Sequence, residues 1–485
     1  MRKGKNPKGR MMPADTYRGG VVSALILLAA LAAALALNLL AGALPDKAMK
    51  IDLTGEGVYS LSEETKTRLH SLTGEVTLTL LAPAGAEDTV LLSVLQKYAA
   101  ESSMITFREK DPALYPHYAE QFTEEAVSEN SVVVESEKRA RFIAYEDLYR
   151  TDVDEEIYAA TGTEGVTTVF VGESRITSAV AYVTGDRLPK VLRLTGHGEA
   201  ALSDGFASAL ALANYEVEEI RLLSLPAVPE GDLLLINDPE TDLSKEEARA
   251  VEEYLGKGGN LLLLTDYETK ALPRLEALAL AYGMEAAHGL VVEGDSAHAI
   301  YSYPYYILPD TGDGEITGSV KDGDFFTVTP MAHGIRFGEN LPHTIGTEEL
   351  LKTSEKAYLK VNIKDGESVE KETGDPTGTF LIGAAAVMNA GEEYESRLIW
   401  FSSAAMTDDA VDGISSGGNI RLILAAAAKA AGQEEYLPIR EKNVSYAHLT
   451  VPAQDVTAVS ILLIGVLPAC ILLAGGIYLW RRRRR

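Results

Sequence analysis

The sequence contains almost no cysteine. Its 485 residues include a single one, Cys470, which lies in an apolar stretch near the C-terminus. Disulfides, cysteine-ligated zinc, thiol catalysis and thioredoxin-type redox chemistry all depend on thiols in defined settings. We therefore exclude these chemistries for the soluble part of the chain.

Basic residues are also scarce. The chain has 44 Lys and Arg residues against 71 Asp and Glu residues, which gives a formal net charge of −27. Binding nucleic acid requires clustered basic side chains that neutralise phosphates, so no nucleic-acid partner is expected. No G-x-x-x-x-G-K-[ST] loop occurs in the sequence, and a transport role would therefore depend on a separate ATPase.

The eight histidines have no H-x-x-x-H or H-x-H spacing. A metal site would have to be assembled from distant segments, for instance from His288, Asp295 and His298, and surface or capping roles are the favoured alternative. We expect no metal and no cofactor.

Two long hydrophobic runs, residues 21–44 and 456–480, lie near the ends of the chain. Each is long enough to cross a hydrocarbon core of about 30 Å, and we predict two transmembrane helices. For the first run, a cleaved secretory signal is the alternative, because Ala41-Gly-Ala43 resembles a cleavage site. The basic residues that flank the two runs are Arg2, Lys3, Lys5, Lys8, Arg10, Arg18 and Arg481–Arg485.

The positive-inside rule assigns both basic tails, residues 1–20 and 481–485, to the cytoplasm. Residues 45–455 are then extracytoplasmic. Without the eleven basic residues of the tails and Asp15, 33 basic and 70 acidic residues remain, a charge of −37. This imbalance favours solubility of the outer part and discourages its adhesion to anionic lipid.

The middle of the chain alternates apolar strands with helices. Strands are predicted at Lys190–Thr195, Val217–Ile220, Leu233–Ile236 and Leu261–Leu264. Ser203 or Asp204 begins one helix, and a capping box at Ser244-Lys-Glu-Glu247 begins the next. Strands that are apolar on both faces and alternate with helices predict a parallel sheet covered on both sides.

This α/β domain spans residues 188–436, with an insertion near residues 300–376 whose strands the sequence does not locate. Its late elements, Thr379–Met388, Arg397–Ser402 and a helix over Asn419–Ala431, add to the same sheet. A linker over residues 437–455 leads to the second hydrophobic run.

An N-terminal module is predicted over residues 46–130, and a connecting β-rich segment follows it over residues 131–187. The module has a βαβαβ order that is thioredoxin-like in outline but has no cysteine pair. Its predicted strands are Met49–Leu53, Val76–Leu81 and Ile105–Arg108, its helices are Ser60–Leu72 and Thr89–Ser102, and the connecting segment has strands at Val132–Val134, Phe142–Ile143, Thr167–Val171 and Ile176–Thr184.

Four short stretches, in this order and between two membrane segments, resemble the GldG-type gliding-motility auxiliary proteins of ABC transport systems. They are Ile51-Asp-Leu-Thr54 with Tyr59-Ser-Leu-Ser62, Gly196-His-Gly198-Glu199, Leu243-Ser-Lys-Glu-Glu247 with Gly258-Gly259, and Leu437-Pro-Ile-Arg440. The resemblance implies a non-catalytic accessory membrane subunit that acts beside an ABC permease and a separate P-loop ATPase. It also implies a thioredoxin-like module and a doubly wound, flavodoxin-like or amidotransferase-like domain.

The loop Gly196-His197-Gly198-Glu199 is the candidate contact site. Three interpretations are open: a dinucleotide fingerprint of the form G-x-G-x-x-A, a small-ligand or partner contact at His197 and Glu199, and a structural turn, which is favoured. The bulky His197 and the late helix start at Ser203 argue against a dinucleotide.

Two further motifs are ambiguous. Gly413-Ile-Ser415-Ser-Gly417 has the hydrolase pattern G-x-S-x-G, but the acidic stretch before it does not read as a strand, so we favour a loop that leads into a helix. The segment Tyr301–Tyr306 is either an aromatic platform for a sugar or peptide or the cover of a sheet edge, and we favour the cover.

We therefore expect an accessory transport subunit, not an enzyme. The alternatives are a stand-alone extracytoplasmic protein that binds or senses a small ligand at Gly196–Glu199 and, less favoured, a hydrolase that uses Ser415 or His197.

Overall fold

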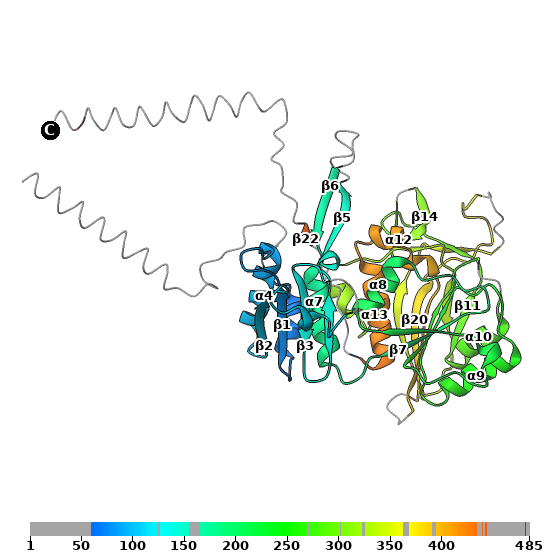
Figure 1. Ribbon diagram of the computed structural model, residues 1–485. Coiled ribbons are helices and arrows are strands. Elements are labelled where there is room, and N and C mark those ends of the chain that lie inside the picture. The colour runs from blue at the N-terminus through cyan, green and yellow to red at the C-terminus, as the bar shows by residue number, and fades with distance from the viewer. Residues whose placement is uncertain are drawn as a thin grey trace, which may run out of the picture.

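The computed structural model describes residues 60–123, 127–154, 165–268, 271–300, 302–322, 325–361, 368–389, 394–433, 439, 442–443 and 481. Figure 1 shows a smaller lobe in blue to cyan beside a larger lobe in green to orange. The predicted spans 21–44 and 456–480, the predicted strand Met49–Leu53 and Cys470 lie outside the described residues. Within the described residues, no helix combines the length and the apolar character needed to cross a membrane.

The chain has a mixed α/β fold with parallel and antiparallel strands. The smaller lobe is built on a four-stranded sheet in the order β2-β1-β3-β4, in which β3 runs antiparallel to its neighbours β1 and β4. Helices α3, α4 and α7 share an apolar core with this sheet. The elements are α3 (Glu63–His70), β1 (Val76–Leu81), α4 (Thr89–Glu101), β2 (Ile105–Lys110), α5 (Pro116–Ala119), β3 (Ser131–Glu135), β4 (Ala140–Ile143), η1 (Tyr145–Leu148) and α7 (Gly172–Thr184).

Two expectations about residues 131–187 need correction. Strand β3 pairs with β1, and β4 pairs with β3, so both belong to the first sheet and not to a separate connecting layer. The predicted strand Ile176–Thr184 is wrong, because this stretch lies in helix α7. Its β-branched residues suggested a strand, but the buried positions Ile176, Val180 and Val183 have the three-to-four spacing of one helix face.

A three-stranded sheet in the order β22-β6-β5 joins distant parts of the chain. The hairpin β5 (Tyr149–Asp154) and β6 (Gly165–Phe170) projects from the smaller lobe (Figure 1). Strand β22 (Lys442–Asn443) pairs antiparallel with β6 at Phe170 and Val169. The chain therefore leaves the smaller lobe after α7, builds the larger lobe over residues 190–433, and returns to the smaller lobe.

A buried ion pair fixes this return. Lys442 lies against the carboxylate of Glu173, and the two side chains are only 8% and 2% exposed. The Lys442 ammonium also donates to the carbonyl oxygen of Ser60, the first described residue. Glu173 accepts further hydrogen bonds from the Ser62 N–H at 2.7 Å and the Thr65 hydroxyl at 2.7 Å. The two ends of the described body thus meet at one buried carboxylate.

The larger lobe contains a ten-stranded mixed sheet. Five neighbouring strands, in the order β8-β7-β9-β10-β21, are parallel, and antiparallel strands extend the sheet beyond β21. Helices α8 and α13 cover one face, and helices α9 and α10 cover the other. The parallel strands are β7 (Lys190–Leu194), β8 (Glu216–Ile220), β9 (Leu233–Asn237), β10 (Leu261–Leu264) and β21 (Ser396–Phe401), and the helices are α8 (Asp204–Leu212), α9 (Lys245–Leu255), α10 (Pro273–Ala281) and α13 (Gly418–Ala431).

The sequence predicted this core well. Along β9, Leu233 and Leu235 pack under α8 and α13, while Leu234 and Ile236 face the opposite side, so the strand is buried on both faces. The late strands β20 and β21 join the central sheet, as expected. The sheet as a whole is mixed rather than wholly parallel.

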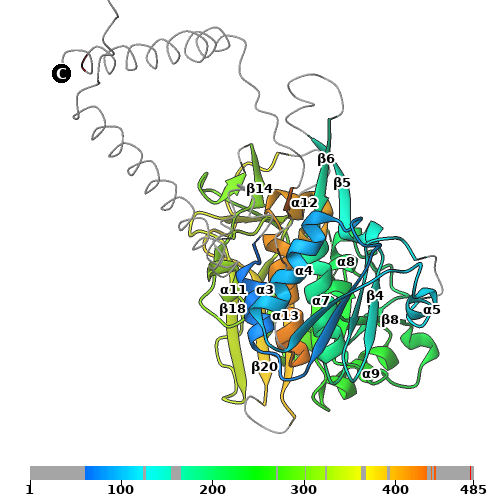
Figure 2. The same ribbon diagram turned by 60° about the vertical axis from the view of Figure 1, so that its left-hand side comes forward.

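The insertion contributes to the central sheet as well. Its strands β17 and β18 pair with β20, and β15 pairs with β18, whereas β14 lies in a small separate sheet. Figure 2 shows β18 and β20 side by side. The remaining elements are η2 (Leu222–Ser224), β11 (Met284–Ala287), β12 (Leu290–Val292), β13 (Ala299–Ile300), β14 (Tyr303–Ile307), β15 (Asp310–Thr311), α11 (Gly318–Asp322), β16 (Thr329–Pro330), β17 (Gly334–Phe337), β18 (Ile345–Lys352), β19 (Tyr358–Lys360), β20 (Leu381–Met388), η3 (Ala404–Thr407) and α12 (Asp409–Ile414).

Polar contacts hold the two lobes together. The Arg141 guanidinium of β4 donates to the Asn214 amide oxygen at 2.8 Å, and the Asn214 amide donates to the Ser178 carbonyl of α7 at 2.9 Å. Asn214 has a φ of 62°, a backbone conformation that asparagine tolerates better than most residues. The turn after α8 is therefore shaped to meet the smaller lobe.

Replacing Glu173 with Gln is expected to lower the free energy of unfolding by about 3 kcal/mol at neutral pH, because it leaves the buried Lys442 ammonium without its carboxylate. Burial alone would raise the pKa of Glu173, but Lys442 and the hydrogen bonds from Ser62 and Thr65 hold it below the usual glutamate value of 4.5. Stability from this group is therefore present above pH 4.5 and is lost as the pH falls below it.

Denaturant unfolding between pH 3 and pH 7 should accordingly give a shallower acid loss for Glu173→Gln than for the native chain. Glu63→Gln removes a carboxylate that is 86% exposed near the same end and serves as the control, with little expected change. Equal stability of the Glu173→Gln protein and the native protein at pH 7 would contradict a structural role for the pair.

Candidate functional site

The Gly196–Glu199 loop lies where the order of the parallel strands reverses. It follows β7, whose neighbours are β8 on one side and β9 on the other. In open α/β sheets, ligands bind beyond the carboxyl ends of the strands at such a switch point. The structure thus places the four predicted residues together at the position where a ligand site is expected on topological grounds.

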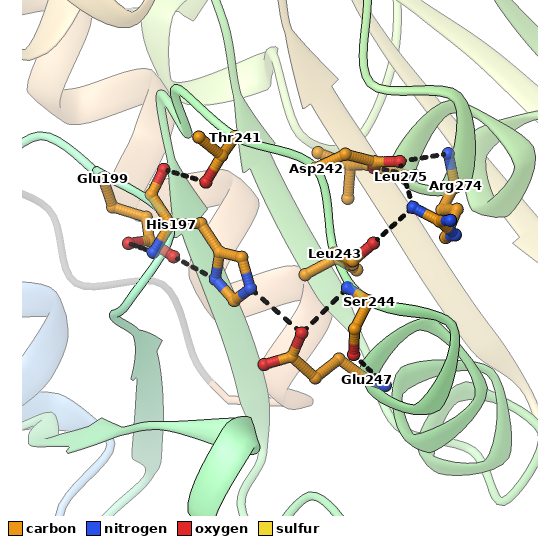
Figure 3. A network of polar contacts seen from close by, with 9 residues as sticks. All are labelled: His197, Glu199, Thr241, Asp242, Leu243, Ser244, Glu247, Arg274 and Leu275. Atoms are coloured by element: carbon orange, nitrogen blue, oxygen red, sulfur yellow. Dashed lines mark hydrogen bonds and ion pairs between the residues drawn. The ribbon is translucent and has the colours of Figure 1, made fainter.

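His197 is enclosed by two carboxylates. Its Nδ1 atom lies 3.1 Å from Glu199 Oε1, and its Nε2 atom lies 3.2 Å from Glu247 Oε2 (Figure 3). The His197 backbone N–H donates to the second Glu199 oxygen at 2.8 Å. The three side chains are 9%, 2% and 8% exposed. Both ring nitrogens therefore face protein carboxylates and not solvent.

Glu247 contributes to this cluster from the first turn of α9. It completes the predicted capping box, in which its carboxylate accepts from the Ser244 N–H at 2.8 Å and its own N–H donates to the Ser244 hydroxyl. Burial works to raise the pKa of Glu247, but the hydrogen bonds from Ser244 and His197 together hold it below the usual glutamate range. The cap and the His197 contact thus use the same carboxylate.

The carbonyl group of His197 extends the network to the loop after β9. It accepts from the backbone N–H groups of Glu240 at 3.0 Å and Thr241 at 2.9 Å. Next in that loop, Asp242 accepts from the N–H groups of Arg274 and Leu275 at the start of α10, as Figure 3 shows. Loops after three neighbouring strands are consequently locked to one another.

The glycines on either side of His197 are required by the backbone. Gly196 and Gly198 have φ angles of 123° and 85°, which side chains rarely adopt. A Cβ atom at Gly198 would also lie 2.9 Å from the Cβ atom of Glu240. The G-x-G pattern is thus explained by a turn that brings His197 between the two carboxylates.

The N-terminus of α8 already holds an anionic group of the protein. Helix α8 begins after the predicted cap Ser203, whose hydroxyl accepts from the Phe206 N–H. The Gly205 N–H donates to the carboxylate of Asp409 at 3.0 Å. Asp409 therefore occupies the position at which a pyrophosphate would lie in the dinucleotide interpretation.

Ser415 lies between α12 and α13, in a loop that leads into a helix. Its side chain is buried, its hydroxyl donates to the Asp412 carbonyl at 2.9 Å, and it accepts from the Asn419 N–H at 3.1 Å. A short helix, α12, precedes it, so the strand that a nucleophile elbow requires is not the element before this serine.

The histidines considered for a metal site pair with different carboxylates. His288 lies 3.4 Å from Glu276, and His298 lies 3.3 Å from Asp310. Within the described ranges, no cluster of three His, Cys, Asp or Glu side chains has a geometry suited to a metal ion.

A hydrogen-bonded chain that the sequence did not reveal lies at the same edge of the sheet. The Trp400 indole N–H donates to the Thr265 hydroxyl at 2.8 Å, which in turn lies 2.8 Å from His333 Nε2. His333 Nδ1 lies 2.8 Å from the Gly334 carbonyl. Because indole only donates and a carbonyl only accepts, these contacts assign the neutral imidazole with its proton on Nδ1.

Burial lowers the pKa of His333 to about 4, in agreement with a neutral ring. The ring borders a cavity of about 20 Å³, which is large enough for one water molecule. Thr265, His333 and Trp400 come from three separate regions of the chain, and only strand pairing brings them together, so no sequence spacing could have identified them.

No family model and no curated protein matches this chain. Among solved structures, the chain is similar to the N-terminal domain of mmIFT52, with 14% identity, coverage of 51% of this chain and 100% of that one, and a TM-score of 0.37. It is also similar to the cytoplasmic protein STM3548 from Salmonella typhimurium, with 10% identity, coverage of 50% and 98%, and a TM-score of 0.29. Similarities this weak carry no functional argument.

Replacing His197 with Ala is expected to lower the free energy of unfolding by about 2 kcal/mol, because two buried carboxylates lose a hydrogen-bond partner. Thermal or denaturant unfolding at pH 7 measures this loss. His70→Ala, in which the imidazole is 60% exposed and pairs with Glu101, is the matched control and should change little. An unchanged stability of the His197→Ala protein would show that the enclosure does not lock the loops.

The low pKa of His333 makes a pH-dependent prediction. The unfolded chain binds a proton near pH 6.5 and the folded chain near pH 4, so stability falls as the pH drops from 6.5 to 4. His333→Gln should remove about 3 kcal/mol of this loss. His288→Gln, which changes a half-exposed neighbouring imidazole, should retain most of it. Identical pH profiles for His333→Gln and the native protein would contradict the assignment.

Proposed function

We propose that this protein is a non-catalytic, membrane-anchored auxiliary subunit of an ABC-type transport system, with an extracytoplasmic body that contacts a partner or client. The proposal starts from the two hydrophobic runs with basic outer flanks, the absence of a P-loop motif from the sequence, and the resemblance to GldG-type proteins. An ABC permease and a separate ATPase are the partners it implies.

The observation that carries the proposal is the contact between the two ends of the described folded body, Ser60 and Lys442. Ser60 and Lys442 touch, and Glu173 binds the segments that contain both. A body whose ends meet at one point is suited to two membrane helices that enter the same bilayer side by side. This geometry favours a folded body attached to two neighbouring membrane helices over a body that lies between two distant membrane helices.

The strand orders support the finer fold assignments. In the smaller lobe, the order β2-β1-β3-β4 with β3 antiparallel is that of a thioredoxin-like module, here in a soluble part without cysteine. In the larger lobe, the parallel strands follow the flavodoxin-like order 2-1-3-4-5 when numbered along the chain. The first module therefore has no cysteine pair for thiol redox chemistry, in line with a contact role.

The state of the switch point favours a contact role over the alternatives. A stand-alone ligand-binding protein would use the Gly196–Glu199 loop, where the side chains of His197 and Glu199 bind each other and Glu247. A hydrolase would use Ser415, which is buried in a loop before α13, or His197, which is enclosed.

Two measurements test the proposal. In a Cys470→Ser background, cells that produce the full chain with one cysteine at an exposed position, such as Leu223→Cys at 88% exposure, should react with a membrane-impermeant maleimide without lysis. Purification in mild detergent should recover a P-loop ATPase and a multi-span permease. The control is a cysteine at Arg483, which should react only after lysis.

Labelling of Arg483→Cys but not Leu223→Cys in intact cells would reverse the topology and overturn the extracytoplasmic assignment. Correct topology without a co-purifying ATPase or permease would instead favour the stand-alone binding protein.

A further inference from the structure

Three large apolar side chains are exposed at one end of the larger lobe. Tyr303 in β14, Phe326 before β16 and Ile414 at the end of α12 are 52%, 47% and 46% exposed. Figures 1 and 2 both place β14 and α12 next to each other, at the end of the molecule from which the β5–β6 hairpin projects. We call these three residues the apolar tip.

Packed aromatic rings support Tyr303 of the apolar tip. The Tyr303 ring packs at 6.1 Å and 5.8 Å from the rings of Tyr305 and Tyr306. Tyr305 in turn packs against a small core around Leu290 and Val292. The exposed tyrosine is therefore held on an aromatic stack and not on a free loop; Tyr301 of the predicted cover lies outside the described residues.

The segment that contains Phe326 is also held in place. Val328, two residues after Phe326, exchanges hydrogen bonds with the Asn419 side chain at 2.8 Å in both directions. The carbonyl oxygen of Phe326 lies so close to Gly418 that a Cβ atom there would be 2.0 Å from it. The segment packs against the start of α13, and the Phe326 side chain lies at the surface.

The apolar tip lies at the same end of the molecule as the contact between Ser60 and Lys442. Strand β22 and the β6 strand to which it pairs lie at that end in Figure 1, and Lys442 of β22 touches Ser60. Residues 444–455, which separate β22 from the predicted second span, reach at most about 40 Å when fully extended. The end of the molecule with the apolar tip is consequently the end that the two predicted transmembrane helices hold toward the bilayer.

We infer that Tyr303, Phe326 and Ile414 insert into the boundary between lipid headgroups and acyl chains, so that the larger lobe rests on the membrane that anchors the chain. Tyrosine suits this boundary, because its ring is apolar and its hydroxyl finds water or headgroup partners. This inference rests on the membrane anchoring in the proposed function, but not on the transport role.

Two acidic residues near the apolar tip bind groups within the protein. Asp409 accepts from the Gly205 N–H at 3.0 Å, and Asp412 accepts from the Ile420 N–H at 3.0 Å. Because the body as a whole is acidic, the expected surface is zwitterionic lipid rather than anionic lipid.

Tryptophan quenching tests this contact in the full chain. The protein is reconstituted in phosphatidylcholine nanodiscs with or without brominated acyl chains. The sequence has two tryptophans: Trp400 is buried, and Trp480 lies in the predicted second span. Quenching of native Trp480 reports the anchoring, and Tyr303→Trp in a Trp480→Phe background reports the apolar tip. Phe326→Trp in the same background is a second reporter if the first variant folds poorly.

Tyr394→Trp in the same background is the matched control. Tyr394 is 58% exposed and lies just before β21, at the opposite edge of the parallel strands from α12. The expected result is loss of most of the added fluorescence for Tyr303→Trp or Phe326→Trp, and little loss for Tyr394→Trp.

Each other outcome has a distinct meaning. If Trp480 is quenched but the tip reporters are not, the apolar tip does not touch lipid and the inference fails, while the anchoring stands. Equal quenching at the apolar tip and at Tyr394→Trp would also overturn it, since the contact would not be specific. If Trp480 itself is not quenched, the predicted span is wrong, and the proposed function fails together with the inference.

Discussion

The arrangement of the whole chain depends on the buried pair between Lys442 and Glu173. Helix α7 supplies the carboxylate, strand β22 supplies the ammonium, and the Ser60–Thr65 segment adds hydrogen bonds to the same two groups. A buried charge of either sign alone would be strongly unfavourable, so each partner requires the other. The pair thereby fixes the position at which the chain enters and leaves its folded body.

The parallel part of the fold was predictable because its signals are local. Apolar runs such as Leu233–Ile236 and the capping box at Ser244 are determined by burial and by helix-end hydrogen bonding within a few residues. The predicted tight loop Gly196–Glu199 does follow the first strand of this domain, and the strand pairing places it at the switch point. Its partner Glu247 could not be foreseen, because the two are fifty residues apart in sequence and meet only when β7 and β9 pair.

Other features of the fold were not predicted from the sequence. Strands β3 and β4 were predicted as strands, but which sheet they join depends on the pairing of β3 with β1, which lies about fifty residues earlier. Helix α7 was missed because isoleucine and valine favour strands, although their spacing in this segment is helical. The Thr265–His333–Trp400 chain has no local signal at all. At the switch point, the strand order indicates a ligand site, but side chains of the protein itself occupy that position.

The return of β22 to β6 has a mechanical consequence. If both ends of the body are pulled toward a membrane, the tension passes from Ser60 to Lys442 through the small sheet and the buried ion pair. The 244 residues of the larger lobe, from 190 to 433, branch off this line and carry no load. The larger lobe therefore keeps its contacts with the smaller lobe while the small sheet and the ion pair bear this tension.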